Sequence, residues 1–165
     1  MIEYRKNNFI TSHGTADTFR LEISPITREP KTYCEELLAN AEEIWNNREG
    51  TLYLLYSGGI DSEVMLEAFL HLKMDVVPVI VNIHPNLNKH DLDHAFAYCK
   101  KRDLKPLVID VDFYKFVNSN EILEIATLAN SGTYQYMTII KAALELKGSV
   151  LCGNEEPYMS PDLSK

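Results

Sequence analysis

The sequence has few cysteines, and they lie far apart. Cys34, Cys99 and Cys152 are odd in number, and no Cys-x-x-Cys pair occurs in the chain. This pattern argues against a zinc ribbon, an iron–sulfur site or a redox pair. The cysteine usage suits a protein kept in the reducing cytosol.

Long apolar runs are also missing. The longest stretch, residues 74–83, is interrupted by an aspartate, a proline and an asparagine. It is much shorter than the roughly 20 residues that a helix needs to cross a bilayer. The first eight residues are charged and polar where a signal peptide would have an apolar core. We therefore expect a cytoplasmic protein that does not associate with membranes.

Positive charge is scarce as well. The chain carries 16 lysine and arginine residues against 24 aspartate and glutamate residues, so its formal net charge is −8. An acidic surface repels phosphate backbones, and nucleic acid is not expected among the partners. The rest of the composition, 45% hydrophobic and 24% charged residues, is typical of an ordinary globular domain.

What the chain does contain is a regular alternation of strand and helix patterns. Residues 1–30 form a mixed N-terminal extension, in which residues 9–11 and 18–23 are expected as short strands of a hairpin. Residues 31–165 form the main domain. Its expected elements, in chain order, are a helix over 31–47, a strand over 51–56, a helix over 62–72, a strand over 75–83, a helix capped by Asn88 and ending near 102, a strand over 106–111, helices over 119–129 and 133–146, and a strand over 149–152.

This alternation predicts an α/β fold, a three-layer α/β/α sandwich around a parallel, Rossmann-like sheet. Because crossovers between parallel strands are right-handed, few strand orders remain, and we expect 3-2-1-4 among the four core strands. That order opens a crevice between the carboxyl ends of strands 1 and 4. Residues 57–62 would form one lip of the crevice, and residues 153–156 the other.

The most informative segment is Ser57-Gly58-Gly59-Ile60-Asp61-Ser62, which joins the first core strand to its helix. Two adjacent glycines let successive backbone N–H groups point into one concavity, and the helix start adds unpaired N–H groups. Such a loop suits a polyanion. Ser57 and Ser62 can add hydroxyl donors, and Asp61 can hold a divalent cation that the anion shares. An ordinary strand–turn–helix junction also needs small residues.

The segment resembles the pyrophosphate-binding loop (PP-loop) of the ATP pyrophosphatase superfamily, whose members are adenine nucleotide alpha-hydrolase-like and whose pattern is Ser-Gly-Gly-x-Asp-Ser. That superfamily includes asparagine synthetase, 7-cyano-7-deazaguanine synthase and phosphoadenylylsulfate reductase. The resemblance covers about two-thirds of the chain, residues 51–156. It implies that ATP and Mg²⁺ are the cofactors, that the sheet has the order 3-2-1-4, and that Asp61 and Ser62 are catalytic. It also implies a set of nucleotide-binding residues in the loop: Tyr56, Ser57, Gly58, Gly59, Ile60, Asp61 and Ser62.

Two further parts of the site follow from the resemblance. Adenine would lie near the end of the second core strand, against the main chain of Val81, Asn82 and Ile83. After the fourth core strand, Gly153 would let the nucleotide approach the backbone closely.

The metal would be shared between the loop and the segment after the fourth core strand. Glu155 or Glu156 would hold Mg²⁺ together with Asp61, and which glutamate matches the family's acidic residue stays open. On residue types alone, the segment could equally be a polar loop after a strand.

Other polar residues are expected to have structural roles. His84, His90 and His94 lie near a helix start, but no further ligand completes a metal site, and we expect exposed side chains. Asp110 and Asp112 follow the third core strand, which lies away from the loop, so turn and cap roles are expected for them.

The resemblance implies an enzyme that cleaves ATP to AMP and pyrophosphate and adenylates an acceptor small molecule that the sequence does not identify. Phosphoadenylylsulfate reductases often have lysine at the position of Ile60, and both they and the thiolating enzymes use cysteine motifs that are absent here. An amidoligase-like activity is therefore favoured over a reductase-like or sulfur-transfer activity.

Only twelve residues follow Gly153, and they read as loop. Two alternatives from other classes therefore stay open. One is a non-catalytic ATP- or AMP-binding module, acting as a homodimer or as a subunit of a larger assembly. The other is an adaptor that acts chiefly through residues 1–30.

Overall fold

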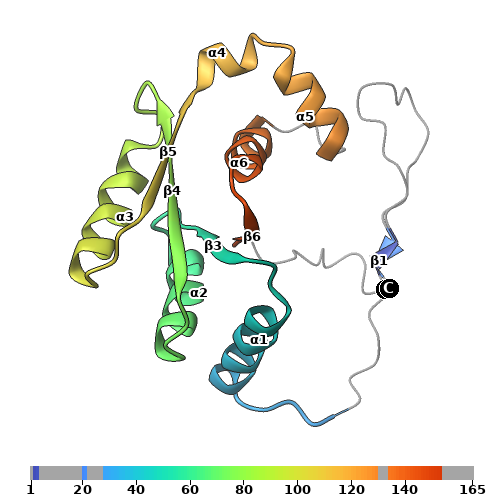
Figure 1. The fold of residues 1–165 in the computed structure, drawn as a ribbon, viewed down its shortest axis with the longest axis vertical. Helices are drawn as coiled ribbons and strands as arrows, with labels where there is room; N and C mark the ends of the chain where they lie inside the picture. Colours follow the sequence, from blue (N-terminus) through green and yellow to red (C-terminus); the bar gives the residue numbers. More distant parts are fainter. Residues whose placement is uncertain (1, 4–19, 22–27, 130–133, 154–165) are drawn as a thin grey trace, which may run out of the picture.

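A sheet of four parallel strands forms the centre of the computed structural model, which describes residues 2–3, 20–21, 28–129 and 134–153 (Figure 1). Its spatial order is β5-β4-β3-β6, which confirms the order 3-2-1-4 expected from the sequence. The strands span Thr51–Leu55 (β3), Val76–His84 (β4), Leu107–Asp112 (β5) and Gly148–Cys152 (β6).

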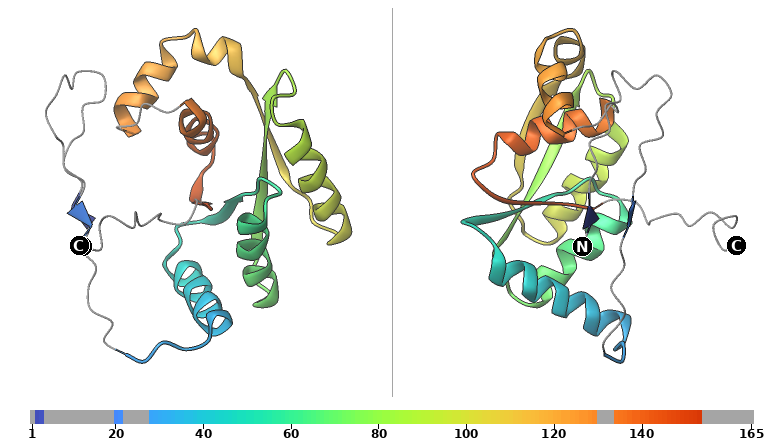
Figure 2. Two further views of the ribbon diagram at one scale, coloured as in Figure 1. Left: turned by 180° about the vertical axis from the view of Figure 1, so that it is seen from behind. Right: turned by 90° about the vertical axis from the view of Figure 1, so that its right-hand side faces the viewer.

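Helices cover both faces of this sheet and make the three layers expected. The six helices of the described residues are Tyr33–Asn47 (α1), Ile60–His71 (α2), Lys89–Lys101 (α3), Phe113–Val117 (α4), Glu121–Ala129 (α5) and Tyr134–Leu144 (α6). Figures 1 and 2 show α3 on one side of β4 and α6 on the other.

Two apolar clusters fix these layers. One joins α1, α2 and α3 to one face of β3 and β4, through buried residues such as Leu54, Leu66 and Ala95. The other joins α4, α5 and α6 to the opposite face, through residues such as Val79 and Met137. Strands β3 and β4 therefore have a buried apolar face on each side, as continuous apolar runs in a parallel sheet require.

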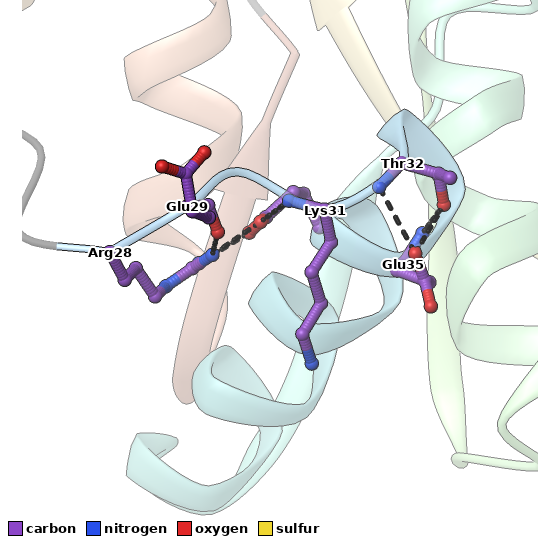
Figure 3. A network of polar contacts seen from close by, with 6 residues as sticks. Arg28, Glu29, Lys31, Thr32 and Glu35 are labelled. Atoms are coloured by element: carbon purple, nitrogen blue, oxygen red, sulfur yellow. Dashed lines mark hydrogen bonds and ion pairs between the residues drawn. The ribbon is translucent and has the colours of Figure 1, made fainter.

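Helix α1 begins at a capping box, which fixes its first residue two positions later than the expected start at 31 (Figure 3). The Glu35 backbone N–H donates to Thr32 Oγ1 at 3.4 Å, and the Thr32 N–H donates to Glu35 Oε2 at 3.0 Å. Just outside the box, Arg28 donates to both carboxylate oxygens of Glu36, each at 2.5 Å. These bonds, with the Lys31 N–H, lower the pKa of Glu36 to about 2.

Helices α2 and α4 also differ from the sequence expectation. Helix α2 begins at Ile60 and not at Ser62, because Gly59, with extended backbone angles, takes the N-cap position without a side chain. Helix α4 was not expected at all. Asp112 caps it by accepting from the Lys115 N–H at 3.0 Å, which confirms a cap role for this aspartate.

In the N-terminal region, Ile2–Glu3 (β1) pairs antiparallel with Arg20–Leu21 (β2). The expected strand over 18–23 includes β2, whereas the expected strand over 9–11 lies outside the described residues. None of the described helices is long and apolar enough to cross a membrane.

Candidate functional site

The loop between β3 and α2 is held against the first turns of α3. Gly58 has φ +86°, a conformation that favours glycine. A Cβ placed on Gly58 would lie 2.7 Å from Asp91 O and 2.9 Å from Ala95 N, both backbone atoms of α3. The contact leaves no room for a side chain, so glycine at this position sets where the loop lies.

Three hydrogen bonds close a ring inside the loop. The Gly59 N–H donates to Ser57 Oγ at 3.3 Å, and the two serine hydroxyls lie 3.2 Å apart. Ser62 Oγ donates to Gly59 O at 2.9 Å, so the hydrogen between the serines must come from Ser57. Because Ser62 is buried and both hydroxyl hydrogens are used, the serines shape the loop in this structure.

The other backbone amides of the loop have no partner among the described residues. Within residues 28–129 and 134–153, no protein acceptor lies within bonding distance of five N–H groups, those of Ser57, Gly58, Ile60, Asp61 and Ser62. The last three are the first N–H groups of α2, which have no acceptor within the helix. The side chain of Ile60 is 73% exposed, and that of Asp61 is also exposed. The loop therefore offers unpaired donors on an open rim.

A cavity of about 230 Å³ lies beside the loop, at the carboxyl ends of β3, β4 and β6. Ser57 and Gly153 both line it, so the two expected lips of the crevice border one space. The volume is a little below the roughly 300–1,000 Å³ of typical small-molecule pockets, so the cavity accommodates part of a nucleotide. Among the described residues, its lining includes Asp91 but no lysine, arginine or histidine.

Gly153 is packed against the start of α2. A Cβ there would lie 3.1 Å from Met65 Sδ and 3.7 Å from Ser62 N. The end of β6 therefore lies directly beside the loop amides. Glu155 and Glu156, the expected metal ligands that follow, lie outside the described residues.

The Tyr56 side chain points away from the rim and into the apolar cluster under α2 and α3. Its ring centroid lies 5.6 Å from that of Tyr98, and only 2% of the residue is exposed. The Tyr56 hydroxyl has no hydrogen-bond partner in the described parts of the chain, and burial raises its pKa to about 12. A ligand in the cavity can thus reach the Tyr56 main chain but not its ring.

The end of β4, expected to meet adenine, is already occupied by a side chain. Asn88 Nδ2 donates to Val81 O at 2.8 Å, and the Ile83 N–H donates to Asn88 Oδ1 at 3.0 Å. The expected N-cap position of Asn88 is confirmed, but the side-chain bond that defines a cap is not made, because the side chain is used on β4.

The Asn82 side chain is directed elsewhere, to the neighbouring strand. Asn82 Nδ2 donates to Asp110 Oδ1 at 2.7 Å, and His84 Nε2 lies 2.9 Å from the same oxygen. These bonds, first that from His84 and then that from Asn82, lower the pKa of Asp110. The three side chains form an exposed cluster on β4 and β5.

Two exposed carboxylates in the described site can hold a metal, that of Asp61 in the loop and that of Asp91 on the cavity lining. His90 and His94 stack with ring centroids 4.9 Å apart, while His84 lies in the cluster with Asp110. Across the described residues there is no group of three or more histidine, cysteine or acidic side chains placed to hold a metal ion. The donor set suits Mg²⁺, which commonly takes one or two carboxylates together with phosphate oxygens and water.

No protein-family model and no curated protein matches the sequence. Among solved structures, the chain is similar to an NH3-dependent NAD synthetase from Campylobacter jejuni subsp. jejuni NCTC 11168 in complex with the nitrate ion. The two are 19% identical, with a TM-score of 0.44, over 68% of this chain and 46% of that one. The chain thus spans less than half the length of that synthetase. The likeness is too slight to say anything of the site, whose function is argued below from its own residues.

Proposed function

We propose that this protein binds ATP with Mg²⁺ at residues 57–62 and transfers the adenylyl group to an acceptor, with release of pyrophosphate. The observation that carries the proposal is the set of five backbone amides in residues 57–62 that have no acceptor among the described residues, in a loop that borders the cavity through Ser57. Unpaired N–H groups at a helix start, joined by a glycine turn, attract the oxygens of a polyphosphate. Their place at the carboxyl ends of parallel strands is where open α/β sheets bind ligands.

Because the described lining of the cavity contains no cationic side chain, a metal ion is needed to neutralise the phosphate charge. A triphosphate carries several negative charges, and the backbone amides supply only partial positive charge. The carboxylates of Asp61 and Asp91 add further negative charge at the rim. Binding therefore requires Mg²⁺, held by the exposed Asp61 and by phosphate oxygens.

The reaction follows from which phosphates the loop holds. With the β- and γ-phosphates on the amides, an oxygen of the acceptor attacks the α-phosphorus. The bond to the bridging oxygen between the α- and β-phosphorus breaks, and its electron pair leaves with pyrophosphate. The loop contributes by alignment and by stabilising the charge that develops on the departing pyrophosphate. A nitrogen or sulfur nucleophile would then displace AMP, and an amidoligase-like nitrogen transfer is our preferred outcome.

A non-catalytic nucleotide-binding module is the second candidate. It is favoured because the described residues contain no group of three or more histidine, cysteine or acidic side chains placed to hold a metal ion. Assays of pyrophosphate release with Mg-ATP and candidate acceptors separate the two. Release marks the enzyme, and nucleotide binding without turnover marks the module.

The test of the proposal is calorimetric titration with a non-hydrolysable ATP analogue and Mg²⁺. Asp61→Asn should weaken binding by about 10- to 100-fold, since a hydrogen bond or contact to a charged group contributes roughly 1.5–3 kcal/mol. Glu63→Gln, in the same first turn of α2, is the matched control and should bind as the wild type does. Wild-type affinity in Asp61→Asn would remove the metal assignment, and no binding by the wild type would refute the proposal.

A further inference from the structure

The Asn88 side chain makes two hydrogen bonds to β4 in place of the one that would cap α3. At a helix N-cap, an asparagine side chain normally accepts from an N–H of the first turn, a bond worth about 1 kcal/mol. Here the carboxamide turns back to β4, where it binds Val81 O and Ile83 N at 2.8 and 3.0 Å. The side chain is only half-buried, and it lines the cavity.

The main-chain groups that Asn88 binds lie on the edge of β4 that faces β3, beyond the point where β3 ends. Val79 O accepts from the Tyr56 N–H at 2.8 Å, so Val79 faces β3. Because alternate residues of a strand face the same neighbour, Val81 and Ile83 face that side too. Strand β3 ends at Leu55, and the loop turns away into α2. The edge therefore faces the cavity.

Few groups on this edge remain for a ligand. Val81 O and Ile83 N bind Asn88, and Ile83 O accepts from the Leu87 N–H at 2.9 Å. Of the main-chain groups of Val81 and Ile83, only the Val81 N–H has no partner within residues 28–129 and 134–153. A base that reads the main chain of β4 must therefore compete with the Asn88 carboxamide.

The carboxamide presents the same pattern as the base that is expected here. Its N–H donates to Val81 O and its oxygen accepts from Ile83 N–H. The adenine edge likewise places a donor, the 6-amino group, beside an acceptor, N1. We propose that Asn88 is the residue that controls access to the base subsite, and that adenine enters by replacing its carboxamide on β4. This proposal rests on the proposed function.

After adenine displaces it from β4, the Asn88 side chain has a second position available, at the start of α3. Once released from β4, the carboxamide oxygen can accept from a first-turn N–H of α3 if the Asn88 backbone, now at φ −124° and ψ 30°, also turns to the extended angles of an ordinary N-cap. Part of the cost of displacement is then recovered. The protein would pass between a closed state with Asn88 on β4 and an open state with the base there.

The test compares two ligands by calorimetric titration in the presence of Mg²⁺. Tripolyphosphate contacts only the loop, whereas the non-hydrolysable ATP analogue also places a base on β4. Asn88→Ala removes the competitor, so the analogue should bind about tenfold more tightly, because two bonds of roughly 0.5–1.5 kcal/mol each no longer have to be broken. Tripolyphosphate should bind equally to both proteins. Leu87→Ala, an exposed side chain in the same turn, is the control and should change neither affinity.

A measurement on the wild-type chain removes any dependence on how the variant folds. The side-chain amide protons of Asn88 can be followed by NMR as each ligand is added. Saturation with the analogue should move them and speed their exchange with water, and tripolyphosphate should leave them unchanged.

The outcomes separate the two proposals. If the analogue binds, but Asn88→Ala does not bind it more tightly and the NMR signals of the Asn88 amide protons do not shift, the Asn88 side chain is a permanent structural link between β4 and α3. The inference is then overturned while the proposed function stands. If neither tripolyphosphate nor the analogue binds the wild type, the proposed function fails, and this inference fails with it.

Discussion

The position of the loop depends on a contact between Gly58 and the backbone of α3, and Gly58→Ala tests it directly. The added methyl group would lie 2.7 Å from Asp91 O and 2.9 Å from Ala95 N. Neither atom can rotate away, because both belong to the main chain of a helix. The residue would also have to keep φ +86°, which L side chains rarely adopt.

The expected loss of stability can be estimated from these terms. A left-handed backbone costs a residue with a Cβ roughly 1–2 kcal/mol, and overpacking costs typically 1–3 kcal/mol. The smaller entropy of the unfolded alanine chain offsets about 0.4–1 kcal/mol. The net destabilisation is about 1–5 kcal/mol, which in a chain of this length lowers Tm by roughly 2–20 °C.

Gly59→Ala is the matched control, one residue along the same loop. Gly59 has φ −80°, and its nearest atom to an added Cβ is Ser57 Oγ at 3.4 Å, an ordinary contact. We expect its free energy of unfolding to stay within about 1 kcal/mol of the wild type. Urea unfolding followed by circular dichroism measures both variants. Equal stabilities of the two variants would refute the argument that Gly58 fixes the loop against α3.

The remaining predictions concern the core and the start of α1. Tyr56→Phe removes a buried hydroxyl that has no partner in the described residues, so the free energy of unfolding should be unchanged or higher. Tyr98→Phe loses a hydrogen bond to Glu67, so its free energy of unfolding, measured in urea, should fall by about 1 kcal/mol. The pKa of Glu36 is lowered from 4.5 to about 2, chiefly by the hydrogen bond from Arg28. The ionised carboxylate therefore stabilises the fold above pH 4.5, and this contribution is lost as the pH falls toward 2. The Tm difference between wild type and Glu36→Gln should therefore shrink between pH 5 and 2. A difference that stays constant over this range would contradict the assignment.

The sequence identified the loop because its signal is local. Two adjacent glycines between an apolar strand and a helix leave few conformations, and the free amides follow from those conformations. The roles of the two serines were not readable in the same way. Whether Ser57 and Ser62 face a ligand or one another depends on rotamers, and in the structure they bind one another and Gly59.

Nothing in the sequence indicated the role proposed for Asn88. Asparagine before a helix is the usual signal of an N-cap, and local preference alone gives no reason to expect anything else. The side chain turns to β4 because the strand beside it ends early and leaves main-chain groups without partners. Whether the side chain caps α3 or binds β4 depends on how β3, β4 and α3 pack, so no local pattern around residue 88 reveals it.

The amino-acid order by itself determined the α/β class and the glycine turn at residues 57–62, since periodicity and backbone sterics act over short stretches of chain. The observed strand order 3-2-1-4 is one of the few that right-handed crossovers leave open, and the sequence alone did not single it out. Tertiary structure alone decided that Gly58 contacts α3, that Tyr56 points into the core and that Asn88 covers the edge of β4. Each of these depends on which surfaces meet when distant elements pack, and on where a backbone donor or acceptor is left without its neighbour.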